Sequence, residues 1–70
     1  MRGEMTVTIN GEPRGITRSK NVAELIEELG LPAPAILVEH NGLALRREEW
    51  PGRLLADGDR IELVRIVAGG

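Results

Sequence analysis

Apolar and polar residues alternate near the start of the chain. Residues 5–10 follow the period-two pattern of a strand with one buried face. Asn10-Gly11 follows directly, and this dipeptide favours a hairpin turn because both residues tolerate positive φ. Residues 13–17 form a weaker return arm, in which Pro13 suits a strand start or a sheet edge. The pattern predicts an N-terminal β-hairpin.

A helical period replaces the alternation after residue 20. Asn21 is placed as an N-cap, and Glu24 three residues later is placed to complete a capping box. Gly30 is placed as the C′ residue, and Pro32 and Pro34 prevent continuation. The apolar face has the spacing i, i+3, i+4 and i+7 of a helix and consists of Val22, Leu25, Ile26 and Leu29.

The second half of the chain reads mainly as strands. Residues 35–39 form a nearly unbroken apolar run, which predicts a central strand covered on both faces. Asn41-Gly42 predicts a second hairpin turn into a short arm at residues 43–45. Residues 46–55 read as an irregular connection, and residues 60–67 as the last strand.

These elements predict an α+β fold in which a mixed sheet of four to five strands packs on one main α-helix. A single helix covers only one face of a sheet. A chain of 70 residues has room for one core, so residues 1–70 are expected to form a single domain.

Composition excludes several classes of function. The chain has no cysteine, which excludes thiol chemistry and cysteine-ligated metal centres. Charged residues are interspersed, the net charge is −2 and there is one aromatic residue, so a nucleic-acid partner is not expected. No apolar run approaches the length of about 18 residues that a membrane span needs. We expect a cytoplasmic protein without a membrane partner.

Catalytic groups are scarce. The lone His40 stands beside a hairpin turn and is interpreted as a surface residue. Asp57 and Asp59 flank a glycine before a strand, where turn formation is the simpler role. No metal-ligand spacing is present, so neither a metal site nor enzymatic activity is predicted.

Trp50 has two interpretations. It is either a residue at the edge of the core whose indole N–H reaches a partner, or an exposed anchor for another protein. The first is favoured.

The C-terminus offers a specific chemistry. Gly69-Gly70 makes a slim end, because glycine has no Cβ. Residues 67–70 are expected to form a flexible tail reaching about 13–14 Å when extended. A terminal carboxylate has a pKa of about 3.5, so it is ionised at neutral pH and is a poor electrophile. It needs activation by a partner, and acyl-adenylate formation with ATP is the natural route.

The strand before this tail adds an interaction surface. Ile61 and Leu63 are expected to face the core, which places Val64 and Ile66 on the opposite side. Apolar residues on an uncovered sheet face suggest a docking patch, unless they pack against a neighbouring segment.

Several segments in this order resemble the ThiS family of sulfur carriers, which have the ubiquitin-like β-grasp fold. The resemblance runs from Met5 to Gly70. The segments are Val22-Ala23-Glu24-Leu25 through Leu29-Gly30, Asn41-Gly42, Arg47-Glu48-Glu49-Trp50, Asp57-Gly58-Asp59-Arg60-Ile61-Glu62 and Val67-Ala68-Gly69-Gly70.

The resemblance implies a sequence of partners. A ubiquitin-activating-like enzyme would adenylate the Gly70 carboxylate with ATP, so this chain itself needs no bound cofactor. Sulfur, ultimately from a cysteine desulfurase, would replace AMP to give a thiocarboxylate, and thiazole synthase would take up that sulfur. Ala68 and Gly69 match the family's tail, whereas partner contacts at Val64, Ile66 and Val67 rest on strand position.

Related functions stay open. The small subunit of molybdopterin synthase shares fold and tail, although Trp50 and residues 62–68 are closer to the thiazole carriers. Carriers for tRNA thiolation or cysteine synthesis use the same tail chemistry. Two further classes of function also fit the pattern, namely a non-covalent interaction module and a ubiquitin-like modifier of lysines.

Overall fold

The computed structural model describes residues 4–67 and begins with a β-hairpin. Its strands are β1 (Met5–Ile9) and β2 (Glu12–Ile16), which pair antiparallel. Asn10 and Gly11 have φ values of 52° and 84°, the left-handed backbone that this dipeptide favours. The predicted hairpin is confirmed.

The main helix, α1 (Val22–Glu28), begins and ends where the sequence predicts. The side chain of Asn21 accepts a hydrogen bond from the N–H of Glu24 at 2.8 Å. The carboxylate of Glu24 accepts from the N–H of Lys20 at 2.7 Å, one residue before the N–H that a capping box uses. Gly30 has a φ of 70° and follows the C-cap, as expected of a C′ residue.

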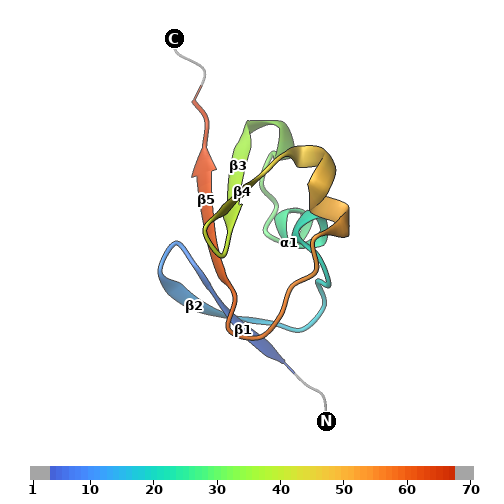
Figure 1. The fold of residues 1–70 in the computed structure, drawn as a ribbon, viewed down its shortest axis with the longest axis vertical. Helices are drawn as coiled ribbons and strands as arrows, with labels where there is room; N and C mark the ends of the chain where they lie inside the picture. The colour runs from blue at the N-terminus through green and yellow to red at the C-terminus, as the bar shows by residue number, and fades with distance from the viewer. Residues whose placement is uncertain (1–3, 68–70) are drawn as a thin grey trace.

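The remaining strands complete a five-stranded sheet. After a short 3₁₀-helix η1 (Ala33–Ala35), β3 (Ile36–His40) and β4 (Leu43–Leu45) form the second hairpin. The last strand, β5 (Arg60–Arg65), lies parallel to β1 and antiparallel to β3. The strand order is β2-β1-β5-β3-β4, so β5 occupies the centre and Pro13 lies on an edge strand (Figure 1). The predicted α+β fold is confirmed.

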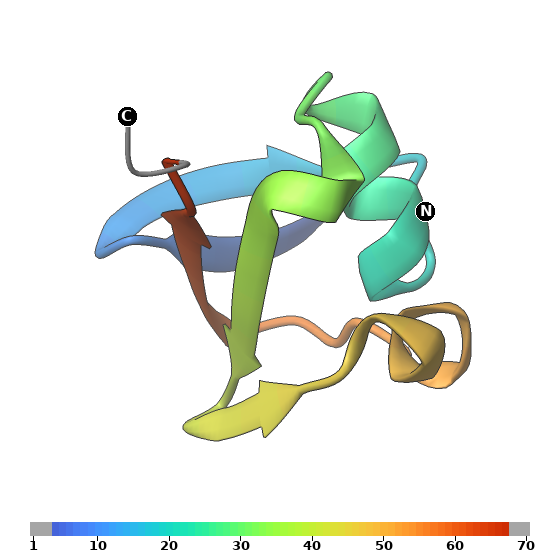
Figure 2. The same cartoon turned by 90° about the horizontal axis from the view of Figure 1, so that it is seen from above.

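The expectation for residues 35–39 is wrong in one respect. Ile36, Val38 and His40 are buried, but Leu37 is 54% exposed and Glu39 is also exposed. The alternation arises because α1 lies against one face of the sheet only, as Figure 2 shows. The other face of β3 is therefore open.

The connection expected to be irregular contains a 3₁₀-helix, η2 (Arg47–Gly52). It packs against α1 and buries Trp50, which is only 3% exposed. Trp50 is therefore a core residue, and the interpretation as an exposed anchor is wrong. Its indole N–H finds no hydrogen-bond partner within residues 4–67, contrary to expectation.

The core lies between α1, η2 and the covered face of the sheet. No helix in the described part of the chain is long and apolar enough to cross a membrane. The buried apolar side chains are Val7, Ile9, Ile16, Val22, Leu25, Ile26, Ile36, Val38, Leu45, Trp50, Leu55 and Ile61.

Candidate functional site

The position of β5 determines what the end of the chain presents. Ile61 is fully buried and Leu63 packs against the core, whereas Val64 is 56% exposed. The predicted alternation along the last strand is confirmed. Since β5 is hydrogen-bonded to a neighbour on each side, it is a rigid base for whatever follows it.

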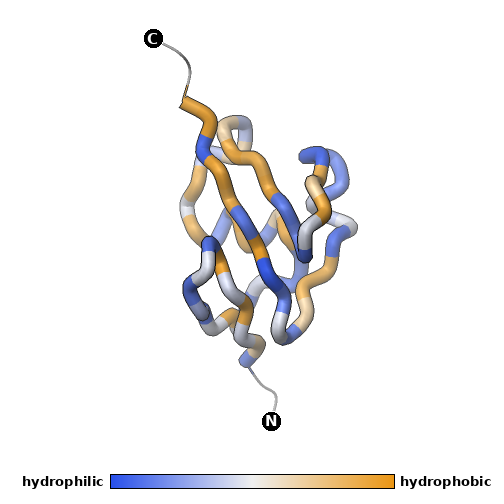
Figure 3. The backbone as a smooth tube through the Cα atoms, turned by 60° about the vertical axis from the view of Figure 1, so that its left-hand side comes forward, coloured by the Kyte–Doolittle hydropathy of each residue, from blue (hydrophilic) through white to orange (hydrophobic). Residues whose placement is uncertain are grey.

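An apolar patch lies on the open face of the sheet, next to the C-terminal end of β5. Val64 is directly opposite Leu37 on β3, and both are more than half exposed. Ile66, at 49% exposure, continues the alternate positions of β5 beyond Val64. Figure 3 shows that the C-terminal end of this strand is rich in hydrophobic residues. We call Leu37, Val64 and Ile66 the apolar patch.

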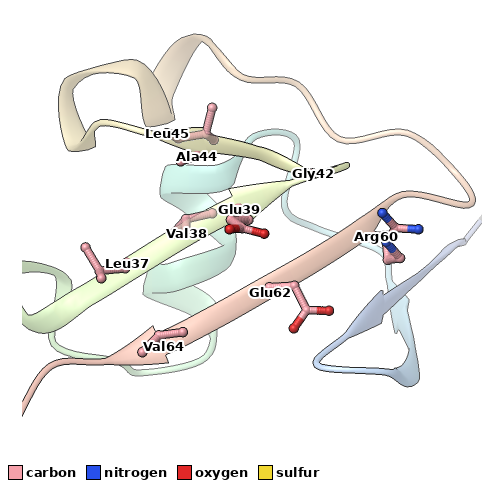
Figure 4. A pocket seen from close by; sticks show the side chains of 9 residues that line it. All are labelled: Leu37, Val38, Glu39, Gly42, Ala44, Leu45, Arg60, Glu62 and Val64. Carbon is pink, nitrogen blue, oxygen red and sulfur yellow. The ribbon is translucent and has the colours of Figure 1, made fainter.

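A pair of glutamates borders the apolar patch on the side away from the C-terminus. Glu39 lies opposite Glu62 across β3 and β5, one step of the alternation from Leu37 and Val64. Figure 4 shows both carboxylates, with Arg60 further along β5. These three side chains border a shallow groove of about 600 Å³. The residues that line the groove are Leu37, Val38, Glu39, Gly42, Ala44, Leu45, Arg60, Glu62 and Val64.

The backbone just after β5 is still hydrogen-bonded to the neighbouring segment before β3. The N–H of Ile66 donates to the carbonyl of Ala35 at 2.7 Å. Val67 follows at 82% exposure. Ala68, Gly69 and Gly70 lie outside the described residues, so the predicted tail over residues 67–70 and its reactive end stay predictions.

Two asparagines of the hairpin turns form side-chain hydrogen bonds to the backbone of β5, one from each side. Asn10 accepts from the N–H of Leu63 at 2.7 Å and donates to its carbonyl at 3.2 Å, so its side chain extends the β1 ladder. Asn41 accepts from the N–H of Arg60 at 2.8 Å on the other side. Sequence reasoning gave these residues only a turn role, because their partners are distant in the chain.

His40 is buried, which overturns its interpretation as a surface residue. Arg53 donates through Nε to Nδ1 of His40 at 2.9 Å, so Nδ1 is an acceptor and the ring proton is on Nε2. Nε2 in turn donates to Oδ2 of Asp59 at 2.6 Å. These contacts join the end of β3 to the turn before β5. Both ring nitrogens of His40 are engaged in hydrogen bonds, so neither is free to act as a catalytic base.

Asp59 is the anionic end of this cluster. Burial alone would raise its pKa. Hydrogen bonds from Asn41, from His40 and from the N–H of Ala56 stabilise the ionised form more strongly, and they hold the pKa of Asp59 below its ordinary value. Asp59 is therefore a turn residue, as expected, and also a buried hydrogen-bond acceptor.

This lowered pKa predicts acid sensitivity. A carboxyl group whose pKa is lower in the folded state stabilises the fold above its unfolded pKa of about 4, and this contribution is lost as pH falls through the folded value. We expect Asp59→Asn to cost about 1–3 kcal/mol of the free energy of unfolding at pH 7. The difference from the unmodified chain should shrink below about pH 4. Urea unfolding across this range measures it.

The control is Glu48→Gln, which removes one negative charge from an exposed side chain and so measures the effect of a change in net charge alone. A difference between Asp59→Asn and the unmodified chain that stays constant from pH 7 to pH 2 would contradict the assignment.

Over residues 4–67, no group of three or more His, Cys, Asp or Glu side chains could hold a metal ion.

The missed part of the site is on β3. Sequence reasoning selected Val64 on β5 and Ile66 just beyond it. It did not select Leu37, which lies opposite Val64, or Glu39, which lies opposite Glu62. The signal was present, since the polar Glu39 interrupts the apolar run at an alternate position.

Comparisons with known proteins agree with this architecture. A five-stranded mixed sheet around one helix, with the last strand central, defines the ubiquitin-like β-grasp class. The crystal structure of a thiamine biosynthesis protein, ThiS, from Geobacter metallireducens superposes with a TM-score of 0.81. It is 35% identical and covers 94% of this chain and all of that one.

Sequence comparison identifies the family. The ThiS family model matches residues 7–70. A sulfur carrier protein ThiS from Thermus thermophilus is 39% identical over 91% of this chain and 98% of its own length. This chain therefore belongs to the ThiS family.

A further relative is much longer than this chain. A thiazole synthase from Paramagnetospirillum magneticum is 33% identical over 94% of this chain, which spans only 20% of that relative's length.

Proposed function

We propose that this chain is a sulfur carrier for thiazole formation in thiamine biosynthesis, with the carboxylate of Gly70 as the group that carries sulfur. The observation that supports it most is the family match, which extends over residues 7–70 and thus includes both terminal glycines. The central β5, clasped on both sides, gives this end a rigid base.

The chemistry needs an enzyme other than this chain. A carboxylate oxygen attacks the α-phosphorus of ATP, and pyrophosphate leaves to give an acyl adenylate. Hydrosulfide then attacks the carbonyl carbon, and AMP leaves to give the thiocarboxylate. Both steps require stabilisation of phosphate charge and of an oxyanion. The partner supplies this stabilisation and binds ATP, while the carrier supplies only the reacting group and no catalysis.

Three partners follow from this chemistry. They are a ubiquitin-activating-like adenylating enzyme, a cysteine desulfurase as the ultimate sulfur source, and thiazole synthase as the acceptor. The similarity to part of a protein named thiazole synthase supports the last. Val64, Ile66 and Val67 are the proposed contacts, because they are exposed and lie directly before or at the start of the tail. Because loading consumes ATP, the proposal includes a cytoplasmic location for the carrier.

Intact mass spectrometry tests the proposal. The chain ending at Gly70 is incubated with ATP, the adenylating enzyme and sulfide. We expect a mass gain equal to the difference between a sulfur and an oxygen atom, localised to Gly70 by fragmentation. An unchanged mass, with the same enzyme active on another carrier, would contradict the proposal.

A further inference from the structure

The open face of the sheet carries a feature that folding alone does not explain. Glu39 and Glu62 are directly opposite each other on adjacent strands. Like charges in this position destabilise a sheet. Neither forms an ion pair with any residue of the described part of the chain, although Arg60 is only two residues from Glu62.

The pair lies on the open face of the sheet, next to the apolar patch that precedes the tail. Three residues beyond Val67 extend at most about 11 Å, so a protein acting on Gly70 must approach this end of the molecule closely. Val64 and Leu37 lie on the same open face as the two glutamates, nearer to the C-terminal end of β5 (Figure 4). An enzyme that covers the apolar patch thus meets the acidic pair next.

The chemistry at the tail indicates the charge of the approaching surface. An active site that binds both a carboxylate and the triphosphate of ATP needs cationic groups, which extend a positive potential around its entrance. The carrier's acidic pair is complementary to such a surface. A guanidinium or ammonium group seated between the two carboxylates would also relieve their mutual repulsion.

We propose that Glu39 and Glu62, together with Leu37 and Val64, form a docking surface for the adenylating enzyme, which inserts a basic side chain between the two carboxylates. This inference rests on the proposed function and specifies how the carrier recognises its first partner. The pair lowers the stability of the free carrier and contributes to binding.

Single substitutions separate these two effects. We expect Glu39→Gln and Glu62→Gln each to raise the melting temperature by about 1–5 °C, because a like-charge pair is removed. Each should also raise the Kd for the adenylating enzyme about 5- to 10-fold. Increased stability together with weaker binding is not expected if the residues have only a structural role.

Charge reversal sharpens the test. Glu62→Lys places opposite charges across the strands, which favours the fold while repelling a cationic partner. We expect it to weaken binding most, by about 50-fold or more, and to flatten the decrease of affinity with added salt. The matched control is Glu27→Gln, an exposed residue of α1 on the other side of the molecule, with an unchanged Kd.

The measurement is calorimetric titration of each variant with purified adenylating enzyme and, separately, with thiazole synthase, alongside the mass assay for sulfur on Gly70. Unchanged Kd values for all three variants, with normal sulfur transfer to the unmodified chain, would overturn the docking surface alone. Weakened binding to thiazole synthase but not to the adenylating enzyme would overturn the choice of partner. Failure of the unmodified chain to gain sulfur would refute the proposed function and this inference with it.

Discussion

Removal of Gly70 should abolish sulfur loading while leaving the fold intact. Deletion shortens the tail by about 3.5 Å, and a single residue added after Gly70 displaces the carboxylate by as much. Misplacement of a reacting group by as little as about 1 Å can reduce a rate about 100-fold. We expect at least that loss of thiocarboxylate formation for either variant, measured by intact mass after a fixed time with the adenylating enzyme.

The matched control adds one residue before Met1, which changes the length without moving Gly70. Urea unfolding should show the same midpoint for all of these chains, since the described core ends before the tail. Full loading of a chain extended past Gly70 would contradict the carrier role and favour a non-covalent interaction module.

Truncation of a buried helix side chain, Leu25 of α1, should have the largest effect on stability. Leu25 is fully buried, at 0% exposure, and Leu25→Ala removes its contacts and leaves a cavity. Such changes cost about 2–5 kcal/mol. A domain of 70 residues has about 4–10 kcal/mol in total, so a large share of its free energy of unfolding is lost.

Leu54→Ala is the control, because Leu54 has the same side chain but is 70% exposed. Its unfolding midpoint in urea should change little, whereas that of Leu25→Ala should fall by about 2 M or more. Similar midpoints for the two variants would contradict the assignment of Leu25 to the core.

The fold was predictable from sequence wherever local signals were strong. Asn10-Gly11 and Asn41-Gly42 specify hairpins because few other residues adopt their positive φ, and the spacing from Val22 to Leu29 specifies a helix face. These signals act within a few residues. They also agree with one another, which is why the order of elements could be inferred correctly.

The errors concern residues whose environment depends on distant partners. His40 is buried because Arg53 and Asp59 are brought to it by other elements, and nothing next to it in the chain announces this. The open face of β3 was mispredicted because the run from Ile36 to Val38 reads as continuously apolar, although the single predicted helix can cover only one face of the sheet.

The candidate site divides in the same way. Gly69 and Gly70 were selected on local chemistry that needs only a chain end, and their role stays a prediction. Val64 followed from the alternation along one strand. The contribution of Leu37 and Glu39 depends on the register between β3 and β5, which the sequence alone does not fix.

The parallel pairing of β1 with β5 has a practical consequence. Because these neighbours run in the same direction, Met5 and Val67 lie at opposite ends of the sheet (Figure 1). A dye, affinity handle or solid support attached ahead of Met5 would therefore lie away from the apolar patch. The chain can be immobilised by that end with the apolar patch directed toward an enzyme in solution, which makes it suitable for surface-based measurement of binding and of each proposed transfer step.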